Sequence, residues 1–314
     1  MSNLSTSSFK KNLLQFTLFA VVFALCYCAL FFVLSSISYK NKNLLGVIQP
    51  KLYFYKNETE KTFFDFDKNT TYDYLFIGGS HAFKSFDTDV FKENGLNTYN
   101  LGTPSQTALN SYFILKEHLQ NTKKVIYEIY PPVIGMKGFE SFNILCSSTN
   151  NYPLLLTTAL ALEDAQAFEL ITLKPIISYK LNKQSIALPP AKQGYRGTPY
   201  FAKASETTYP AIDLNPAVID EQLEYLEKII LMCKENNKEL IFVYAPIPKQ
   251  LLVLNEQDLF YKHINAIVSK YSIRFINMSR SLDLDSEKHF FDNNHLNIDG
   301  AKIFNEAFLK ELAH

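Results

Sequence analysis

Residues 72–83, Tyr-Asp-Tyr-Leu-Phe-Ile-Gly-Gly-Ser-His-Ala-Phe, decide the fold of this chain. The apolar run up to Ile77 predicts a short strand. Gly78 and Gly79 let the backbone turn sharply at its end, because glycine has no Cβ to restrict it. Ser80 then stands where a helix can begin, beside the first free N–H groups of that helix. The turn presents Ser80 as a candidate nucleophile, although a phosphate-binding turn or a plain strand-to-helix connection would have the same sequence.

A serine hydroxyl is a weak nucleophile and needs a base, together with an acid that orients the base. Residues 290–297, Phe-Phe-Asp-Asn-Asn-His-Leu-Asn, supply both. His295 is the candidate base and Asp292 the candidate orienting acid. Taken alone, this pair is also typical of a helix cap or of a surface histidine whose hydrogen bonds are satisfied locally.

Two other histidines compete with His295. His289 lies on the same loop and is the second candidate base, but the order of acid before base favours His295. His81 follows Ser80 directly, and adjacent side chains diverge, so we expect His81 to line the pocket or to be exposed.

Strand and helix patterns alternate along most of the chain. Apolar runs predict strands, and apolar residues at helical spacing predict helices. Strands are expected at residues 72–77, 97–101, 125–130, 239–245 and 273–277, and helices at 87–93, 105–122, 219–234, 258–271 and 300–312, the last capped by Asp299. Such alternation favours parallel βαβ units, and we predict an α/β fold with a five-stranded parallel sheet.

The N-terminal part reads as a membrane anchor. Residues 12–39 carry no charge, and Leu13 to Ile37 are dominated by Leu, Phe, Val and Ala. A membrane helix needs about 20 such residues, whereas the apolar part of a signal peptide, the alternative, has about 7–15. We predict a tail and single-pass anchor at 1–39, a connector at 40–71 and a catalytic domain at 72–314, with the N-terminus inside and the domain outside the plasma or inner membrane.

Residues 131–216 form an insertion, because they are too long for a simple crossover between strands. The stretch 154–173 is expected to be helical, and the loop around Gly194 and Gly197 to be hinged. Tyr195 and Arg196 on this loop are candidate substrate-binding residues, although a solvated arginine is the more common case.

The composition gives no support for nucleic-acid binding or for a metal site. Lys and Arg balance Asp and Glu at 31 each, so no basic field favours nucleic acid. Neither the four cysteines nor the six histidines show metal-ligand spacing, and we expect no metal and no cofactor. A bridge between Cys146 and Cys233 is left open.

The order Ser, Asp, His on this pattern resembles the SGNH (GDSL-like) hydrolase superfamily. The resemblance implies a flavodoxin-like three-layer sandwich with Ser80, Asp292 and His295 as catalytic residues. Residues 99–102, Tyr-Asn-Leu-Gly, resemble its second block, which implies that the N–H groups of Gly102 and Ser80 form the oxyanion hole. A Gly-x-Asn-Asp block is absent. Residues 130–132, Tyr-Pro-Pro, stand in its place, so the usual asparagine donor is missing or another residue supplies it.

Within the superfamily, the anchor, the Gly-Gly-Ser-His block and the Asp-x-x-His-Leu-Asn block resemble an envelope-bound branch. That branch is similar to the D-alanyl transfer protein of teichoic acid synthesis and to alginate O-acetylation proteins, which work with membrane-bound O-acyltransferases. The resemblance implies a serine esterase or acyltransferase acting on O-acyl groups of a cell-envelope glycan. The alternative is a non-catalytic SGNH-shaped partner of such an acyltransferase. A nucleotide-binding domain is disfavoured, because the turn lacks G-x-G-x-x-G.

Overall fold

A computed structural model describes residues 3–39, 42–43, 62–181, 192–199, 212–254 and 258–313. The chain divides into two units, and the boundary falls inside helix α9 (Ala165–Leu181). The first unit holds residues 1–54 and 172–184, and the second holds residues 55–171 and 185–314. The predicted catalytic residues all belong to the second unit.

The second unit is built on a parallel five-stranded sheet with the order β4-β3-β5-β6-β7. The strands are β3 (Tyr72–Gly78), β4 (Thr98–Asn100), β5 (Thr122–Glu128), β6 (Glu239–Tyr244) and β7 (Arg274–Asn277). This confirms the predicted α/β fold, and the strand order is that of flavodoxin-like folds. The order reverses between β3 and β5, so a crevice is expected where these two strands end.

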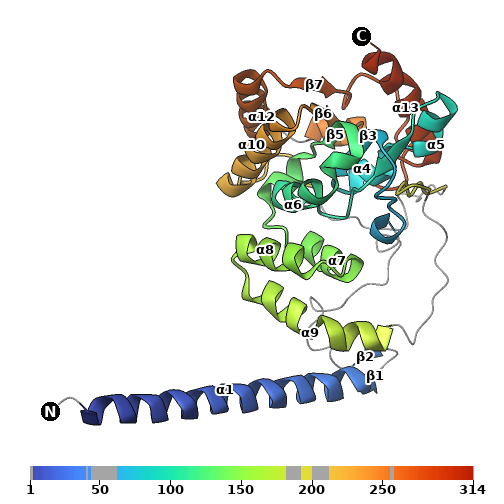
Figure 1. The fold of residues 1–314 in the computed structure, drawn as a ribbon. Coiled ribbons are helices and arrows are strands. Elements are labelled where there is room, and N and C mark those ends of the chain that lie inside the picture. The colour runs from blue at the N-terminus through green and yellow to red at the C-terminus, as the bar shows by residue number, and fades with distance from the viewer. Residues whose placement is uncertain are drawn as a thin grey trace. The chain divides into compact units, whose positions relative to one another are not determined.

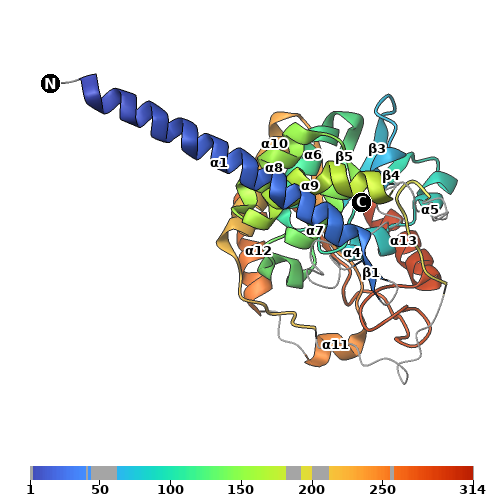
Figure 2. The ribbon, with the colours of Figure 1, turned by 90° about the horizontal axis from the view of Figure 1, so that it is seen from below.

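Helices cover both faces of the sheet, which explains why the strands are continuous apolar runs rather than alternating ones. Leu75, Phe76 and Ile77, for example, are all fully buried although they point to alternate faces. Figures 1 and 2 show α10 and α12 on one side of the sheet and α5 and α13 on the other. The covering helices are α4 (Ser80–Ser85), α5 (Thr88–Glu93), α6 (Ala108–His118), α10 (Asp220–Glu235), α12 (Asp258–Tyr271) and α13 (Ile298–Leu312).

The closing helix α13 packs against α4, the helix that begins at Ser80. Phe304 and Phe308 of α13 both meet the Phe86 ring, with centroids 5.3 and 5.5 Å away. Asn305 Nδ2 also donates to the Ser85 carbonyl at 2.6 Å. The cap of α13 is Asn297, whose side chain accepts the Gly300 N–H at 2.9 Å. The expected cap, Asp299, instead lies in the first turn, where an acidic side chain suits the positive end of the helix.

The insertion contributes helices of its own. A 3₁₀ helix, η3 (Pro131–Gly135), is followed by α7 (Phe139–Ser148), α8 (Tyr152–Leu162) and α9. One helix was expected over residues 154–173, but α8 ends at Leu162, and Glu163, which follows it, adopts a left-handed conformation with φ of 50°. In the part of the chain that the structure describes, no disulfide joins Cys146 to Cys233.

Residues 192–199 form a segment without helix or strand that contacts three elements of the second unit. The Gln193 carbonyl accepts the Asn100 N–H at 2.9 Å, the Arg196 N–H donates to the Phe83 carbonyl at 2.9 Å, and the Thr198 carbonyl accepts the Ile298 N–H at 3.1 Å. This segment therefore ties the edge strand β4 to α4 and α13. Two short elements, η2 (Leu119–Asn121) and α11 (Lys249–Leu254), complete the second unit.

The first unit holds α1 (Asn3–Ser36) and an antiparallel pair, β1 (Ser38–Tyr39) and β2 (Lys42–Asn43). Within α1, Ser8–Leu34 is long and apolar enough to cross a membrane, a test that a signal sequence near the N-terminus also passes. Most of the predicted connector lies outside the described residues. The proposed division at residues 39 and 71 stays a prediction.

Candidate active site

The turn after β3 places Ser80 at the edge of the sheet where the strand order reverses. Gly78 has a φ of 139°, and a Cβ there would lie 2.6 Å from the Glu128 carbonyl oxygen of β5. Only glycine fits such a position. The first helical bond of α4 runs from the Ala82 N–H to the Gly79 carbonyl at 3.0 Å. The N–H of Ser80, the first residue of α4, precedes that bond and has no acceptor among the described residues.

The acid and the base come from the loop between β7 and α13. Asp292 Oδ1 accepts the N–H groups of Asn294 at 3.0 Å and His295 at 2.7 Å, which folds the loop into a tight turn. The Phe291 N–H donates to the His295 carbonyl at 2.8 Å and closes the turn from the other side. The turn holds the His295 side chain toward α4.

Ser80, His295 and Asp292 form one line of hydrogen bonds. His295 Nε2 lies 2.6 Å from Ser80 Oγ, and His295 Nδ1 lies 2.8 Å from Asp292 Oδ2. With the ring proton on Nδ1 and donated to the carboxylate, Nε2 accepts the serine proton. Such an arrangement can deprotonate the serine as it attacks a carbonyl carbon.

The surroundings of Asp292 keep it ionised. Burial alone would raise its pKa, but hydrogen bonding to the His295 ring and the two backbone N–H groups outweighs burial, so the pKa of Asp292 is lowered from its usual value. An ionised Asp292 holds the His295 ring in the tautomer that leaves Nε2 free to accept a proton.

His81 is fully buried and faces the acid–base loop rather than the cavity or solvent. Its Nε2 lies 3.0 Å from the Asn294 carbonyl, so Nε2 must carry the proton and donate it. The centre of its ring lies 3.8 Å from that of the Tyr130 ring and 4.7 Å from that of the His295 ring. Burial, together with the neighbouring His295, holds the pKa of His81 well below its usual value, so the ring is neutral.

His289, the second candidate base, has a different contact. Its Nδ1 accepts the Asp285 N–H at 2.9 Å and stabilises a turn earlier in the same loop. Its backbone carbonyl accepts the Asn297 N–H at 3.1 Å. His289 thus shapes the loop that carries His295.

Gly102, expected to donate to an oxyanion, has another partner. Its N–H donates to Asn100 Oδ1 at 3.0 Å, and its carbonyl accepts Arg196 Nη2 at 2.7 Å. A Cβ at this position would lie 2.9 Å from the Ala82 Cβ, so close packing against α4 already explains the glycine. Among the described residues, the Ser80 N–H is therefore free to donate to an oxyanion, whereas the Gly102 N–H already donates to Asn100.

Tyr195 and Arg196 pack into the protein instead of lining the cavity beside Ser80. Tyr195 is 5% exposed and belongs to the core that includes Phe76. The Arg196 guanidinium lies 3.8 Å from the centre of the Phe83 ring. Tyr195 therefore anchors segment 192–199 by packing into the core, and Arg196 does so by stacking on Phe83 and donating to the Gly102 carbonyl.

A cavity of about 410 Å³ opens beside Ser80. Its described lining is largely apolar and comprises Ser80, Ser105, Tyr130, Pro132, Val133, Gly135, Met136, Ile212, Asp213, Pro216 and Asn294. Tyr130 and Asn294 were not predicted as site residues. Tyr130 could have been found because Tyr-Pro-Pro replaces the Gly-x-Asn-Asp block. Asn294 could have been found because it lies between Asp292 and His295 in the sequence.

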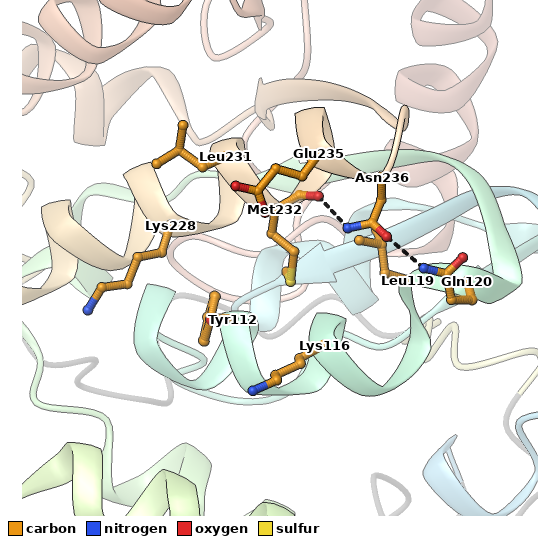
Figure 3. Close-up of a pocket in the computed structure, with 9 residues that line it drawn as sticks. All are labelled: Tyr112, Lys116, Leu119, Gln120, Lys228, Leu231, Met232, Glu235 and Asn236. Atoms are coloured by element: carbon orange, nitrogen blue, oxygen red, sulfur yellow. Dashed lines mark hydrogen bonds between the residues drawn. The ribbon is translucent and has the colours of Figure 1, made fainter.

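Another cavity, of about 450 Å³, lies between α6 and α10 and is shown in Figure 3. Its lining includes Tyr112 and Lys116 of α6 and Lys228 and Met232 of α10. Asn236 connects the two sides, donating to the Met232 carbonyl at 2.8 Å and accepting from Gln120 at 2.7 Å. None of the catalytic candidates lines it. Among the described residues, no group of three or more His, Cys, Asp and Glu could hold a metal ion.

Comparisons with known proteins give distant structural likenesses. No protein-family model and no curated protein sequence matches the chain. A GDSL-like lipase from Bacteroides thetaiotaomicron is similar in structure, with 12% identity, a TM-score of 0.36, and coverage of 85% of this chain and 94% of the lipase. A catalytic mutant of Axe2, an acetylxylan esterase from Geobacillus stearothermophilus, has 12% identity and a TM-score of 0.40, with 78% and 95% covered. Structural similarity at such low identity and TM-score assigns no function to this chain. The function is therefore argued from the geometry of the site.

Proposed function

We propose that this chain is a serine esterase or acyltransferase that cleaves ester bonds through an acyl-enzyme on Ser80. One observation carries the proposal: Ser80 Oγ, His295 and Asp292 are joined by hydrogen bonds of 2.6 and 2.8 Å, and Ser80 lines a cavity large enough for a small acyl group. An ionised Asp292 behind the ring suits this chemistry, because it stabilises the imidazolium that forms when His295 takes the serine proton.

In the proposed reaction, Ser80 Oγ attacks the ester carbonyl carbon while its proton passes to His295 Nε2, and the carbonyl electrons move onto the oxygen. The tetrahedral intermediate collapses, the bond to the leaving alcohol breaks, and the alcohol takes the proton from His295. Water or a second hydroxyl then attacks the acyl-serine, again losing its proton to His295. The acid or the new ester leaves, and Ser80 recovers its proton.

The finer part of the proposal concerns substrate and place. We propose that the acyl group is carried by an O-acylated glycan of the cell envelope, that α1 anchors the chain, and that the catalytic unit lies outside the membrane. The resemblance of the Gly-Gly-Ser-His and Asp-x-x-His-Leu-Asn blocks to the envelope-bound branch supports the glycan and a membrane-bound O-acyltransferase as partner. The length and composition of Ser8–Leu34 support the anchor.

A fluorophosphonate probe tests the chemistry, because it reacts only with an activated serine. We expect the protein in detergent to be labelled and to hydrolyse 4-nitrophenyl acetate, and the Ser80→Ala variant to do neither. The Asp292→Asn variant should lose about 10⁴-fold in kcat, because an asparagine favours the wrong tautomer of the His295 ring. Asp299→Asn, in the exposed first turn of α13, is the matched control and should behave as wild type.

A second candidate function is a non-catalytic subunit that binds a membrane-bound O-acyltransferase. The observation that favours it is the hydrogen bond from the Gly102 N–H to Asn100, which removes one expected oxyanion donor. Equal probe labelling of wild type and Ser80→Ala, or none of either, would favour this function over the esterase.

A further inference from the structure

The proposed reaction needs hydrogen-bond donors at the carbonyl oxygen, because that oxygen becomes negatively charged in the transition state. The N–H of Ser80 is free to donate, whereas the Gly102 N–H is bound to Asn100 at 3.0 Å. No asparagine follows β5, where the resembled superfamily has one. The site as described is therefore short of donors.

Tyr130 is placed to supply one. Strands β3 and β5 are neighbours with Gly78 opposite Glu128, so Tyr130 follows β5 as Ser80 follows β3, two residues beyond the paired position in each case. This is the point of strand-order reversal, where ligands bind in open parallel sheets. Tyr130 and Ser80 line the same cavity. The next residue is a proline, which restricts Tyr130 to the extended conformation seen, with φ of −112° and ψ of 128°.

The Tyr130 hydroxyl has a proton to give. Its oxygen accepts Asn294 Nδ2 at 3.1 Å, and the described residues offer no acceptor for its own proton. A phenol both donates and accepts, so the proton points away from Asn294. The other lining hydroxyls are engaged, since Ser105 donates to Glu140 at 2.6 Å and Ser80 meets His295.

The hydroxyl is also held in place and stays protonated. Tyr130 is 6% exposed, and its ring lies 3.8 Å from the ring of the fully buried His81. Burial raises the pKa of Tyr130 far above neutrality. A donor that is fixed before the reaction stabilises a developing charge better than one that must reorient.

We propose that the Tyr130 hydroxyl, oriented by Asn294, donates a hydrogen bond to the substrate carbonyl oxygen as it becomes an oxyanion. The inference rests on the proposed function and adds a catalytic residue to it. No proton is transferred: Tyr130 keeps its O–H bond while the charge forms on the substrate oxygen and is lost again when the intermediate collapses.

Tyr130→Phe tests the inference, because it removes the hydroxyl and keeps the ring against His81. With 4-nitrophenyl acetate and the full-length protein, we expect kcat to fall about 100-fold or more, KM to stay within about two-fold, and the rate of fluorophosphonate labelling to fall with kcat. Affinity for phenylboronic acid, which forms a tetrahedral anion on serine, should weaken similarly. Tyr112→Phe, in the separate cavity of Figure 3, is the matched control and should leave all three unchanged.

The outcomes separate the two proposals. If wild type is active and Ser80→Ala is not, but Tyr130→Phe keeps wild-type kcat and boronate affinity, the role of Tyr130 is refuted and the esterase stands. If Tyr130→Phe loses activity together with a large drop in Tm, the effect is structural, and the role of Tyr130 is refuted in this case too. If wild type shows no Ser80-dependent labelling, the esterase proposal fails and takes this inference with it.

Discussion

Two carboxyl groups near Ser80 have pKa values that shift in opposite directions. Asp292 accepts hydrogen bonds from the His295 ring and from two N–H groups, and its pKa is lowered. Glu128 is fully buried at the end of β5; burial raises its pKa well above the usual value, and the Gly79 N–H offsets only part of the effect. One carboxyl is thus a charged partner of the base, and the other is a neutral group behind the nucleophile turn.

Glu128→Gln is expected to change how stability depends on pH. Because the folded-state pKa of Glu128 is raised, its contribution to stability is fully present below the unfolded value of 4.5 and is lost as pH rises toward the folded pKa. Over that window the wild type should lose about 1.4 kcal/mol per pH unit from this group. Glutamine carries no charge, so the variant should gain stability over the wild type as pH rises from 4.5 to 7. Urea unfolding across that range measures the difference, and parallel profiles would contradict a protonated Glu128.

At this scale the sequence identified the residues whose chemistry is recognisable by type and order. Ser80, Asp292 and His295 were found because an acid–base pair is needed once a serine is suspected, and the structure brings the three together. Asn294 and Tyr130 were missed because their contact joins positions 164 residues apart. Such a contact depends on the fold, not on any local spacing.

At the scale of elements, the junction of β3 and α4 depends on a close approach of two backbones. Gly78 combines a φ of 139° with a neighbouring carbonyl oxygen 2.6 Å from the position of a Cβ. Gly79, the next residue, has a φ of −72° and only the Val133 Cγ1 at 3.5 Å. Two adjacent glycines therefore have different tolerance for a side chain.

Gly78→Ala is expected to destabilise the protein by about 3 kcal/mol, from backbone strain and the clash with Glu128. Gly79→Ala, the matched control, should cost less than about 1 kcal/mol. Chemical unfolding of both variants measures the costs. Equal effects would show that the turn can relax, and a Gly78→Ala protein of wild-type stability would contradict the geometry described.

Arg196 should matter for stability more than for substrate binding. It is 8% exposed, stacks on Phe83 and donates to the Gly102 carbonyl, and a lysine cannot make the planar contact and the hydrogen bond together. We expect Arg196→Lys to cost about 1–3 kcal/mol with KM for a small ester unchanged. Lys192→Ala removes an exposed ion pair with Asp89 from the same segment and should cost below about 1 kcal/mol. A raised KM with unchanged stability would restore the substrate-binding role.

The strands could be predicted to within a few residues because strands buried on both faces are unbroken apolar runs. The helices of the insertion could not be predicted in the same way, because their boundaries depend on tertiary contacts and on single residues. Glu163 is an example: its left-handed conformation separates α8 from α9. Residues 192–199 looked like a hinged loop, but hydrogen bonds to three distant elements hold them in place.

At the scale of the whole chain, α1 is the feature on which the proposed membrane anchoring rests. Full-length protein should stay with membranes through a carbonate wash at high pH and keep its N-terminal peptide in mass spectra. Replacing Leu18 and Leu25 by arginine should release it, because each charge at the centre of a span costs about 2.5–3.5 kcal/mol. A mature chain that lacks the peptide would identify α1 as a cleaved signal sequence.

The base and the nucleophile lie 215 residues apart and meet only because the last helix packs against the helix that begins at the serine. A ribosome therefore produces Ser80 long before it produces the imidazole that activates it. If the proposed chemistry holds, a nascent polypeptide that has not reached residue 295 is inert toward acyl groups, and a premature stop before that residue leaves the serine without a base. For the proposed chemistry, this architecture makes activity depend on the synthesis of α13 and on its docking against α4.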